Sequence, residues 1–218
     1  MQISGAGSER GWGLFPDGWT GEVLQFVIEV WGDLQLPSNA RLEPRITKLL
    51  AGAIIERYER EERDWFCSPE EPDWNEEGKE VSRTDIRLRP PGIKRRKVAL
   101  ILEGKRLNTP DSNASKYVGT GGMMCFIPTT NTPAKYGAGL PCGVMLGYVM
   151  DGNVPSAYAA LGKAILAKRA SILLTSDGCF QTSPLLVGHK WHGETRHFLP
   201  DRIFTIYHLL LPVRWKAH

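Results

Sequence analysis

The chain has 218 residues, of which 42% are hydrophobic and 23% are charged, and these proportions indicate a soluble globular protein rather than a disordered or fibrous one. Its formal net charge of +3 is too small by itself to indicate a polyanion partner. No apolar run approaches the roughly 20 residues that a membrane-spanning helix needs, and the N-terminus lacks the apolar segment of a signal peptide. We therefore expect a cytoplasmic protein with no membrane contact.

Four cysteines are spread along the chain without any CxxC pair: Cys67, Cys125, Cys142 and Cys179. Their spacing predicts neither a zinc cluster nor a disulfide framework. We therefore expect four reduced thiols.

Two helices are expected in the first 61 residues, after an irregular segment that reaches about Gly18. In the first helix Thr20 is the candidate N-cap and Pro37 ends the pattern. The second helix is expected over residues 39–61, with Ser38 or Asn39 as its cap. Its apolar face is formed by Leu42, Ile46, Leu49, Leu50, Ala53 and Ile54.

An acidic residue lies close to that apolar face. At roughly 100° per residue, Glu43 is within about 50° of the centre of the face, whereas Glu56 lies at its edge. One interpretation is an acid that interacts favourably with the positive end of the helix dipole. The other is a carboxylate that points into a functional site, and in that case either Glu43 or Glu56 is the helix carboxylate.

A short strand is expected at residues 65–67, followed by an acidic turn or exposed loop over 68–80. Two strands then follow, joined by a basic turn that contains Lys94, Arg95, Arg96 and Lys97. The turn is either a solvated hairpin tip or a phosphate contact. In the second strand, residues 98–102 are an unbroken apolar run, which is typical of a strand covered on both faces.

Acidic and basic residues cluster on this strand pair. Asp85 is near the start of the first strand, and Glu103, Gly104 and Lys105 end the second. Because side chains alternate along a strand, Glu103 and Lys105 share a face. The carboxylates of Asp85 and Glu103 can therefore converge at one end of a sheet, as a site for a hard divalent cation with oxygen ligands.

The second half of the chain is expected to continue with both helices and strands. Residues 116–127 predict a helix capped by Ser112 or Ser115, although three glycines interrupt it. Its GTGG cluster lacks the GKS or GKT ending of a phosphate loop. A strand over 141–152, a helix over 154–169 and two strands over 190–198 and 202–211 complete the chain.

Four histidines gather in the last third of the chain: His189, His192, His197 and His208. Their spacings match neither the HExxH helix nor a zinc-finger pair, so we expect structural or solvent-facing histidines. The adjacent Arg196 and His197 are kept as candidate phosphate contacts.

The order of these elements resembles the PD-(D/E)XK nuclease superfamily over residues 38–152. Its four signature residues are matched by Glu43, Asp85, Glu103 and Lys105, and Thr84 stands where the superfamily name has a proline. The resemblance implies an α/β, restriction-endonuclease-like fold with a central mixed β-sheet flanked by helices, an αβββαβ core. We expect one domain over 1–218, with its core at about 38–175, an N-terminal helical extension over 1–37 and C-terminal strands over 176–218 that complete the sheet.

The resemblance also implies roles for the site residues. Asp85, Glu103 and the carbonyl of Gly104 would bind Mg²⁺, for which Mn²⁺ would substitute, and Glu43 would bind it directly or through water. Lys105 would orient or help to deprotonate the attacking water and offset charge on the phosphate. Three close carboxylates repel one another unless a cation lies among them, and such a cation activates water and stabilises a phosphoryl transition state.

The expected activity is therefore metal-dependent hydrolysis of phosphodiester bonds in DNA. RNA as the substrate, or a non-catalytic nucleic-acid-binding or assembly subunit that keeps the fold, remains an alternative. So does a surface ion-pair set on an unrelated α/β domain. Later segments of the chain resemble uncharacterised bacterial or phage-defence relatives, which implies an effector subunit whose target a partner protein selects. The resemblance also allows a homodimer.

Overall fold

The computed structural model describes residues 18–74, 80–90, 98–108, 113–128, 134–136 and 140–216. The basic turn with Lys94, Arg95, Arg96 and Lys97 lies outside these ranges, as does the first segment of the chain. The elements are α1 (Trp19–Asp33), α2 (Glu43–Arg60), β1 (Phe66–Pro69), β2 (Pro72–Trp74), β3 (Glu80–Arg83), β4 (Ile86–Arg89), β5 (Leu100–Leu107), α3 (Ala114–Val118), the 3-10 turn η3 (Met123–Cys125), β6 (Cys142–Val149), α4 (Val154–Ala167), β7 (Gln181–Thr182), β8 (Gly193–Leu199) and β9 (Arg202–Pro212).

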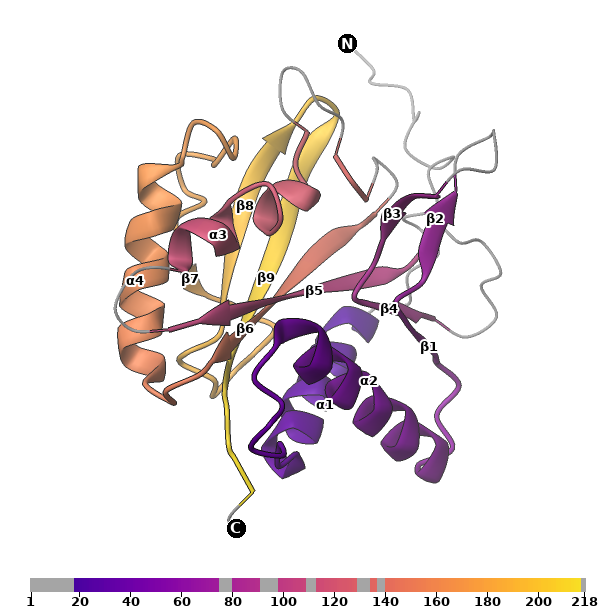
Figure 1. Cartoon of the computed structure of the whole chain (residues 1–218). Helices are drawn as coiled ribbons and strands as arrows, with labels where there is room; N and C mark the ends of the chain where they lie inside the picture. The colour runs from indigo at the N-terminus through magenta and orange to yellow at the C-terminus, as the bar shows by residue number, and fades with distance from the viewer. Residues whose placement is uncertain are drawn as a thin grey trace.

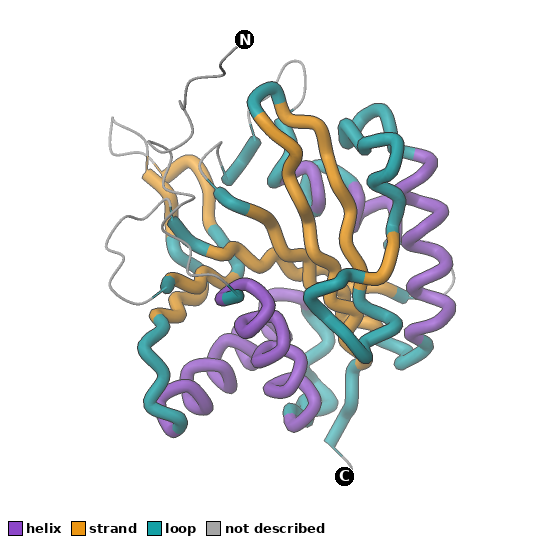
Figure 2. Tube along the Cα trace, turned by 180° about the vertical axis from the view of Figure 1, so that it is seen from behind, coloured by secondary structure: helices purple, strands orange, loops and turns teal. Residues whose placement is uncertain are grey.

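A seven-stranded mixed sheet forms the centre of the molecule, in the order β1-β4-β5-β6-β9-β8-β7. β5, β6 and β9 run parallel to one another, and the remaining neighbours in this sheet pair antiparallel. The α/β class with a mixed sheet and flanking helices is thus confirmed (Figure 1). Seen from behind, β8 and β9 form a long hairpin, and β9 runs from its turn towards the C-terminus (Figure 2).

Two hydrophobic cores lie on the two faces of the sheet. The α1/α2 core contains Leu50 of α2 and Leu102 of β5, and the α3/α4 core contains Leu161 of α4 and Ile101 of β5. Because successive side chains of a strand point to opposite faces, β5 supplies both cores in turn. This arrangement confirms that the apolar run at 98–102 leads into a strand covered on both sides.

The two N-terminal helices begin at other residues than the sequence pattern predicts. α1 starts at Trp19 after Gly18, whose φ of 77° is in the left-handed region that glycine adopts without strain, so Thr20 is inside the helix and is not its cap. α2 starts at Glu43, four residues after Asn39, and Pro44 occupies its first turn, where proline needs no N–H partner. Seven residues of α1 are buried and belong to the hydrophobic core on that face of the sheet.

Other boundaries also differ from the prediction. The segment expected as a loop over 68–80 contains β2, which pairs antiparallel with β3, a strand that begins at Glu80 and reaches Arg83. The helix expected over 116–127 is divided into α3 and η3, because Gly122 approaches the carbonyl of Tyr117 so closely that a Cβ atom would lie 1.9 Å from its oxygen. Among the described residues, none of the helices is both long enough and apolar enough to cross a membrane.

Candidate functional site

The site forms where β4 stops pairing with β5. Ile86 is opposite Leu102 in the antiparallel register, so Asp85 lies next to Glu103 just outside β4. β5 continues to Leu107, which places Glu103, Gly104 and Lys105 in the interior of this strand rather than at its end. Beyond Leu102, no strand among the described residues pairs with the edge of β5 that faced β4.

Two carboxylates take the place of that missing strand. The backbone N–H of Gly104 donates to Asp85 Oδ2 at 2.8 Å, and the N–H of Arg106 donates to Glu43 Oε2 at 3.2 Å. Amides two residues apart on a strand point to the same edge, which is why Asp85 and Glu43 approach β5 from the same side. A buried amide that lost such an acceptor would cost about 1–3 kcal/mol.

The Lys105 ammonium lies among oxygens of three different residues. Its Nζ is 2.8 Å from Glu43 Oε1, 2.9 Å from Glu103 Oε1 and 2.6 Å from the carbonyl oxygen of Gly104. Glu103 and Lys105 meet because they share a face of β5, as predicted, and Glu43 reaches them from the first turn of α2. The cluster thus joins two elements that are about 60 residues apart in the chain.

Burial and neighbouring carboxylates shift the pKa in the same direction at Asp85 and in opposite directions at Lys105. Burial, and then the negative charge of Glu103, raise the pKa of Asp85 to about 6, despite the Gly104 amide and Lys105, which lower it. Burial lowers the pKa of Lys105, but Glu103 and Glu43 outweigh that effect and hold this pKa above its ordinary value. Lys105 is therefore protonated at neutral pH, while Asp85 has a chemical reason to attract a further cation.

Gly104 allows α2 to approach the strand. A Cβ atom at this position would lie 2.8 Å from Thr47 Oγ1 and 2.9 Å from a ring carbon of Tyr148. The Thr47 and Tyr148 hydroxyls are hydrogen-bonded to each other at 2.9 Å, and the Tyr148 ring stacks on Trp31 of α1. Thr47 is one turn after Glu43, so the close approach at Gly104 also brings Glu43 to Lys105.

The structure distinguishes between the two candidate helix carboxylates. Glu43 contacts both Lys105 and the Arg106 amide. Glu56 lies 13 positions further along α2, about 20 Å at 1.5 Å per residue, where it lines a surface hollow together with Asp33 and Arg60. Glu43 is therefore the carboxylate that belongs to the cluster.

Two further residues of the site are not predicted from the sequence. The Tyr136 hydroxyl donates to Glu103 Oε2, and Lys135 Nζ donates to the Tyr136 hydroxyl at 2.8 Å while lying 3.9 Å from the same Glu103 oxygen. Both residues precede β6 in a segment without helix or strand periodicity. No pattern in the sequence therefore links them to Glu103, although they hold its second oxygen.

The donor set fits a hard cation in its chemistry. Within the described ranges, no group of three or more His, Cys, Asp or Glu side chains is arranged to hold a metal ion. However, the three oxygens around Lys105 Nζ belong to two carboxylates and a carbonyl, which are the ligand types that Mg²⁺ and Mn²⁺ take. In the structure, the Lys105 ammonium supplies the positive charge that these three oxygens contact.

The two candidate phosphate contacts in the last third differ in accessibility. Arg196 is 39% exposed and pairs with Glu194 and Asp177. His197 is fully buried, and its ring nitrogens bond to Thr195 Oγ1 and to the carbonyl of Ile172. His197 therefore does not reach a phosphate at the surface, because β8 turns this side chain into the protein.

No protein-family model matches the chain, and no curated protein is similar to it in sequence. The resemblance to the nuclease superfamily therefore depends on the site residues and the order of the elements that carry them.

Proposed function

We propose that the chain is a metal-dependent nuclease of the PD-(D/E)XK type with a restriction-endonuclease-like fold, and that DNA is its substrate. The observation that carries this proposal is the position of the Lys105 ammonium between Glu43, Glu103 and the Gly104 carbonyl, with Asp85 bonded to the same glycine. The element order α2-β1-β4-β5-α3-β6 agrees with the αβββαβ core, with β2 and β3 as an inserted hairpin.

Asp85, Glu103, the Gly104 carbonyl and Glu43 would hold the cation, Mg²⁺ or Mn²⁺. When bound, the cation supplies an activated water and positive charge next to the phosphate. The protein keeps these oxygens in place with the Gly104 and Arg106 amides and with the Tyr136 hydroxyl. These contacts matter because a site that is fixed before the substrate arrives need not reorganise during the reaction.

Lys105 has a role of its own in this proposal. Its raised pKa keeps the side chain charged at neutral pH, which favours donation to the attacking water and to the phosphate oxygens over removal of a proton. Lys135 brings a second positive charge next to Glu103 and is partly exposed, so it is available to a phosphate. Both charges oppose the negative charge that develops during phosphoryl transfer.

The test is a cleavage assay with supercoiled, linear and single-stranded DNA and with RNA, each with Mg²⁺, Mn²⁺ or EDTA. Cleavage of DNA that requires the divalent ion and is lost in Glu103→Gln supports the proposal, and Glu56→Gln on the far part of α2 is the matched control. Unchanged cleavage in Asp85→Ala, Glu103→Ala and Lys105→Ala alike would overturn it. The RNA arm tests the first alternative.

A non-catalytic subunit is the second alternative, and it predicts a different result. Such a protein binds DNA in a salt-dependent way but cleaves nothing with any divalent ion. An effector of a restriction or anti-phage defence system would cleave only after a partner protein is added, or as a homodimer at high protein concentration. A titration of protein concentration in the same assay separates these cases.

A further inference from the structure

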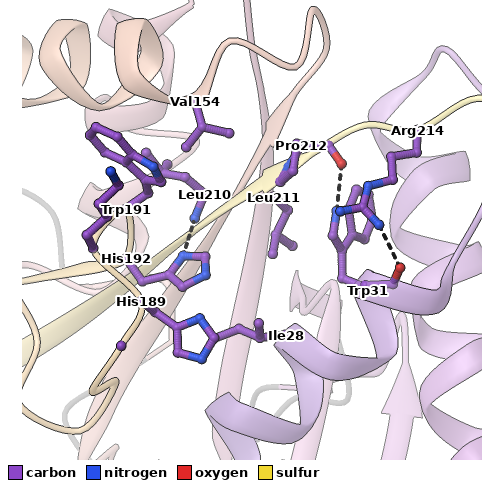
Figure 3. A pocket seen from close by; sticks show the side chains of 13 residues that line it. Ile28, Trp31, Val154, His189, Trp191, His192, Leu210, Leu211, Pro212 and Arg214 are labelled. Atoms are coloured by element: carbon purple, nitrogen blue, oxygen red, sulfur yellow. Dashed lines mark hydrogen bonds between the residues drawn. The ribbon is translucent and has the colours of Figure 1, made fainter.

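A cavity of about 370 Å³ lies between α1, the segment before β8 and the end of β9. It shares no lining residue with the Lys105 cluster. Its apolar wall includes Ile28 and Trp31 of α1, Leu210 and Leu211 of β9, and Trp191 (Figure 3). The volume lies within the range of about 300–1,000 Å³ that small-molecule sites occupy.

The polar lining of this cavity is one-sided in charge. Lys190, Arg214 and His189 contribute to it, whereas none of the described residues that line it is an aspartate or a glutamate. Lys190 Nζ lies 4.8 Å from the centre of the Trp191 ring, so a positive charge and an aromatic surface are adjacent. Val154 is the first residue of α4, and the positive end of that helix dipole therefore lies at the cavity as well.

His192 adds a hydrogen-bond donor of fixed direction. Its Nδ1 accepts the backbone N–H of Leu210 at 3.1 Å, and burial lowers the pKa of this histidine to about 4. The ring is therefore neutral at pH 7 and carries its single proton on Nε2. In the part of the chain that the structure describes, this 7% exposed side chain has no other hydrogen-bond partner.

We propose that this cavity binds a small anion with a planar aromatic body, of the size and class of a nucleoside monophosphate. The ring would lie on the apolar wall with Trp191, and His192 Nε2 would donate to a ring nitrogen or carbonyl. The phosphate would be bound by Lys190, whose ammonium is next to the Trp191 ring. Arg214 lies beside Trp31 at the other end of the cavity, where it donates to the Gly32 carbonyl at 2.8 Å, and it would add only long-range attraction (Figure 3). The absence of acidic residues in the lining favours an anion over a cation or a neutral ligand. This inference does not depend on the proposed nuclease activity.

Isothermal titration calorimetry of the full chain tests the proposal with AMP, GMP, CMP and UMP. Adenosine provides the ring without the anion, and inorganic phosphate provides the anion without the ring. We expect at least one nucleotide to bind with a dissociation constant below about 1 mM, and adenosine and phosphate to bind at least tenfold more weakly. No binding by any of the four nucleotides, or equal binding of AMP and adenosine, would overturn the proposal.

Surface variants locate the binding in the cavity without disturbing the core. Lys190→Gln is expected to weaken nucleotide binding about five- to tenfold, because this exposed lysine is the direct charged partner of the phosphate, and Arg214→Gln only about twofold, because Arg214 acts at long range. Lys168→Gln is the matched control, since Lys168 is an exposed lysine at the opposite end of α4 from Val154. If Lys190→Gln binds the nucleotide as the wild type does, the cavity is not the site.

Discussion

The chain contains two polar clusters that differ in charge and in burial. Around Lys105, three carboxylates and an ammonium lie within a few ångströms at the edge of β5. In the α3/α4 core, Tyr117, His208, Thr195 and His197 form a fully buried chain of hydrogen bonds in which every contact lies between 2.7 and 3.1 Å. The sequence indicates a metal site only for the first cluster, since the histidine spacings match no metal-binding motif.

The hydrogen bonds of the buried chain determine its protons. His197 Nδ1 must donate to the carbonyl of Ile172, so its Nε2 accepts from the Thr195 hydroxyl. Thr195 Oγ1 then accepts from His208 Nε2, and His208 Nδ1 accepts from the Tyr117 hydroxyl. All nitrogens are used in this neutral arrangement, and none remains for a metal. The Lys105 cluster is the opposite case, since its carboxylates exceed its cations.

Removal of charge from the Lys105 cluster is expected to have the largest effect. If the proposed function is correct, Glu103→Gln should reduce DNA cleavage at least about 10³-fold, or about 4 kcal/mol. Glu43→Gln should reduce it about 10- to 100-fold, since its role includes the positioning of Lys105 and Arg106. Initial rates of plasmid nicking measure both effects. Cleavage by Glu43→Gln at the rate of Glu56→Gln would exclude Glu43 from the site.

The neutral chain should contribute to stability and not to metal binding. His208→Ala removes the acceptor of the Tyr117 hydroxyl and the donor to Thr195 Oγ1 and leaves a cavity in a closed core, and we expect a loss of about 2–4 kcal/mol in the free energy of unfolding. Tyr117→Phe removes one hydrogen bond at nearly constant shape and should cost about 1 kcal/mol. Urea denaturation measures both, and a His208→Ala protein as stable as the wild type would contradict the assigned network.

The buried histidines also predict acid sensitivity. Burial lowers the pKa of His208 to about 3 and that of His197 to about 4, so the folded protein keeps both rings neutral while the unfolded chain protonates them below about pH 6.5. Their stability contribution is therefore complete above pH 6.5 and lost as the pH falls towards 4, by up to about 1.4 kcal/mol per pH unit for each histidine. Thermal unfolding between pH 7.5 and 5 should show this loss, and it should be smaller in His208→Ala. An equal slope in both proteins would contradict it.

Removal of the Asp85 charge is expected to change the stability in the opposite direction. The pKa of Asp85 is raised from 3.8 to about 6, so the ionised side chain costs stability, and this cost grows as the pH rises from about 4 through 6. Asp85→Asn keeps an oxygen for the Gly104 amide and should stabilise the protein by about 1–2 kcal/mol at pH 7 in EDTA. The gain should disappear below pH 4, where the carboxyl is protonated in both states. Destabilisation by Asp85→Asn at pH 7 would show that the cluster is not short of positive charge.

The sequence by itself determined the α/β class, the existence of the two N-terminal helices, the strands around Asp85 and Glu103, and the shared face of Glu103 and Lys105. These features depend on local periodicity, which is determined by residues close together in the chain. Helix starts were less well predicted, because Gly18 and Pro44 set them through backbone conformation and not through the apolar pattern.

Only the tertiary structure decided which residues complete the site. Glu43 and Glu56 are both glutamates of the same helix. The close approach of Thr47 to Gly104 is what brings Glu43, and not Glu56, to Lys105. Tyr136 and Lys135 reach Glu103 from an irregular segment, and His197 is withdrawn into the core by the pairing of β8 with β9. Each of these outcomes depends on contacts between residues far apart in the chain, and such contacts leave no period in the sequence.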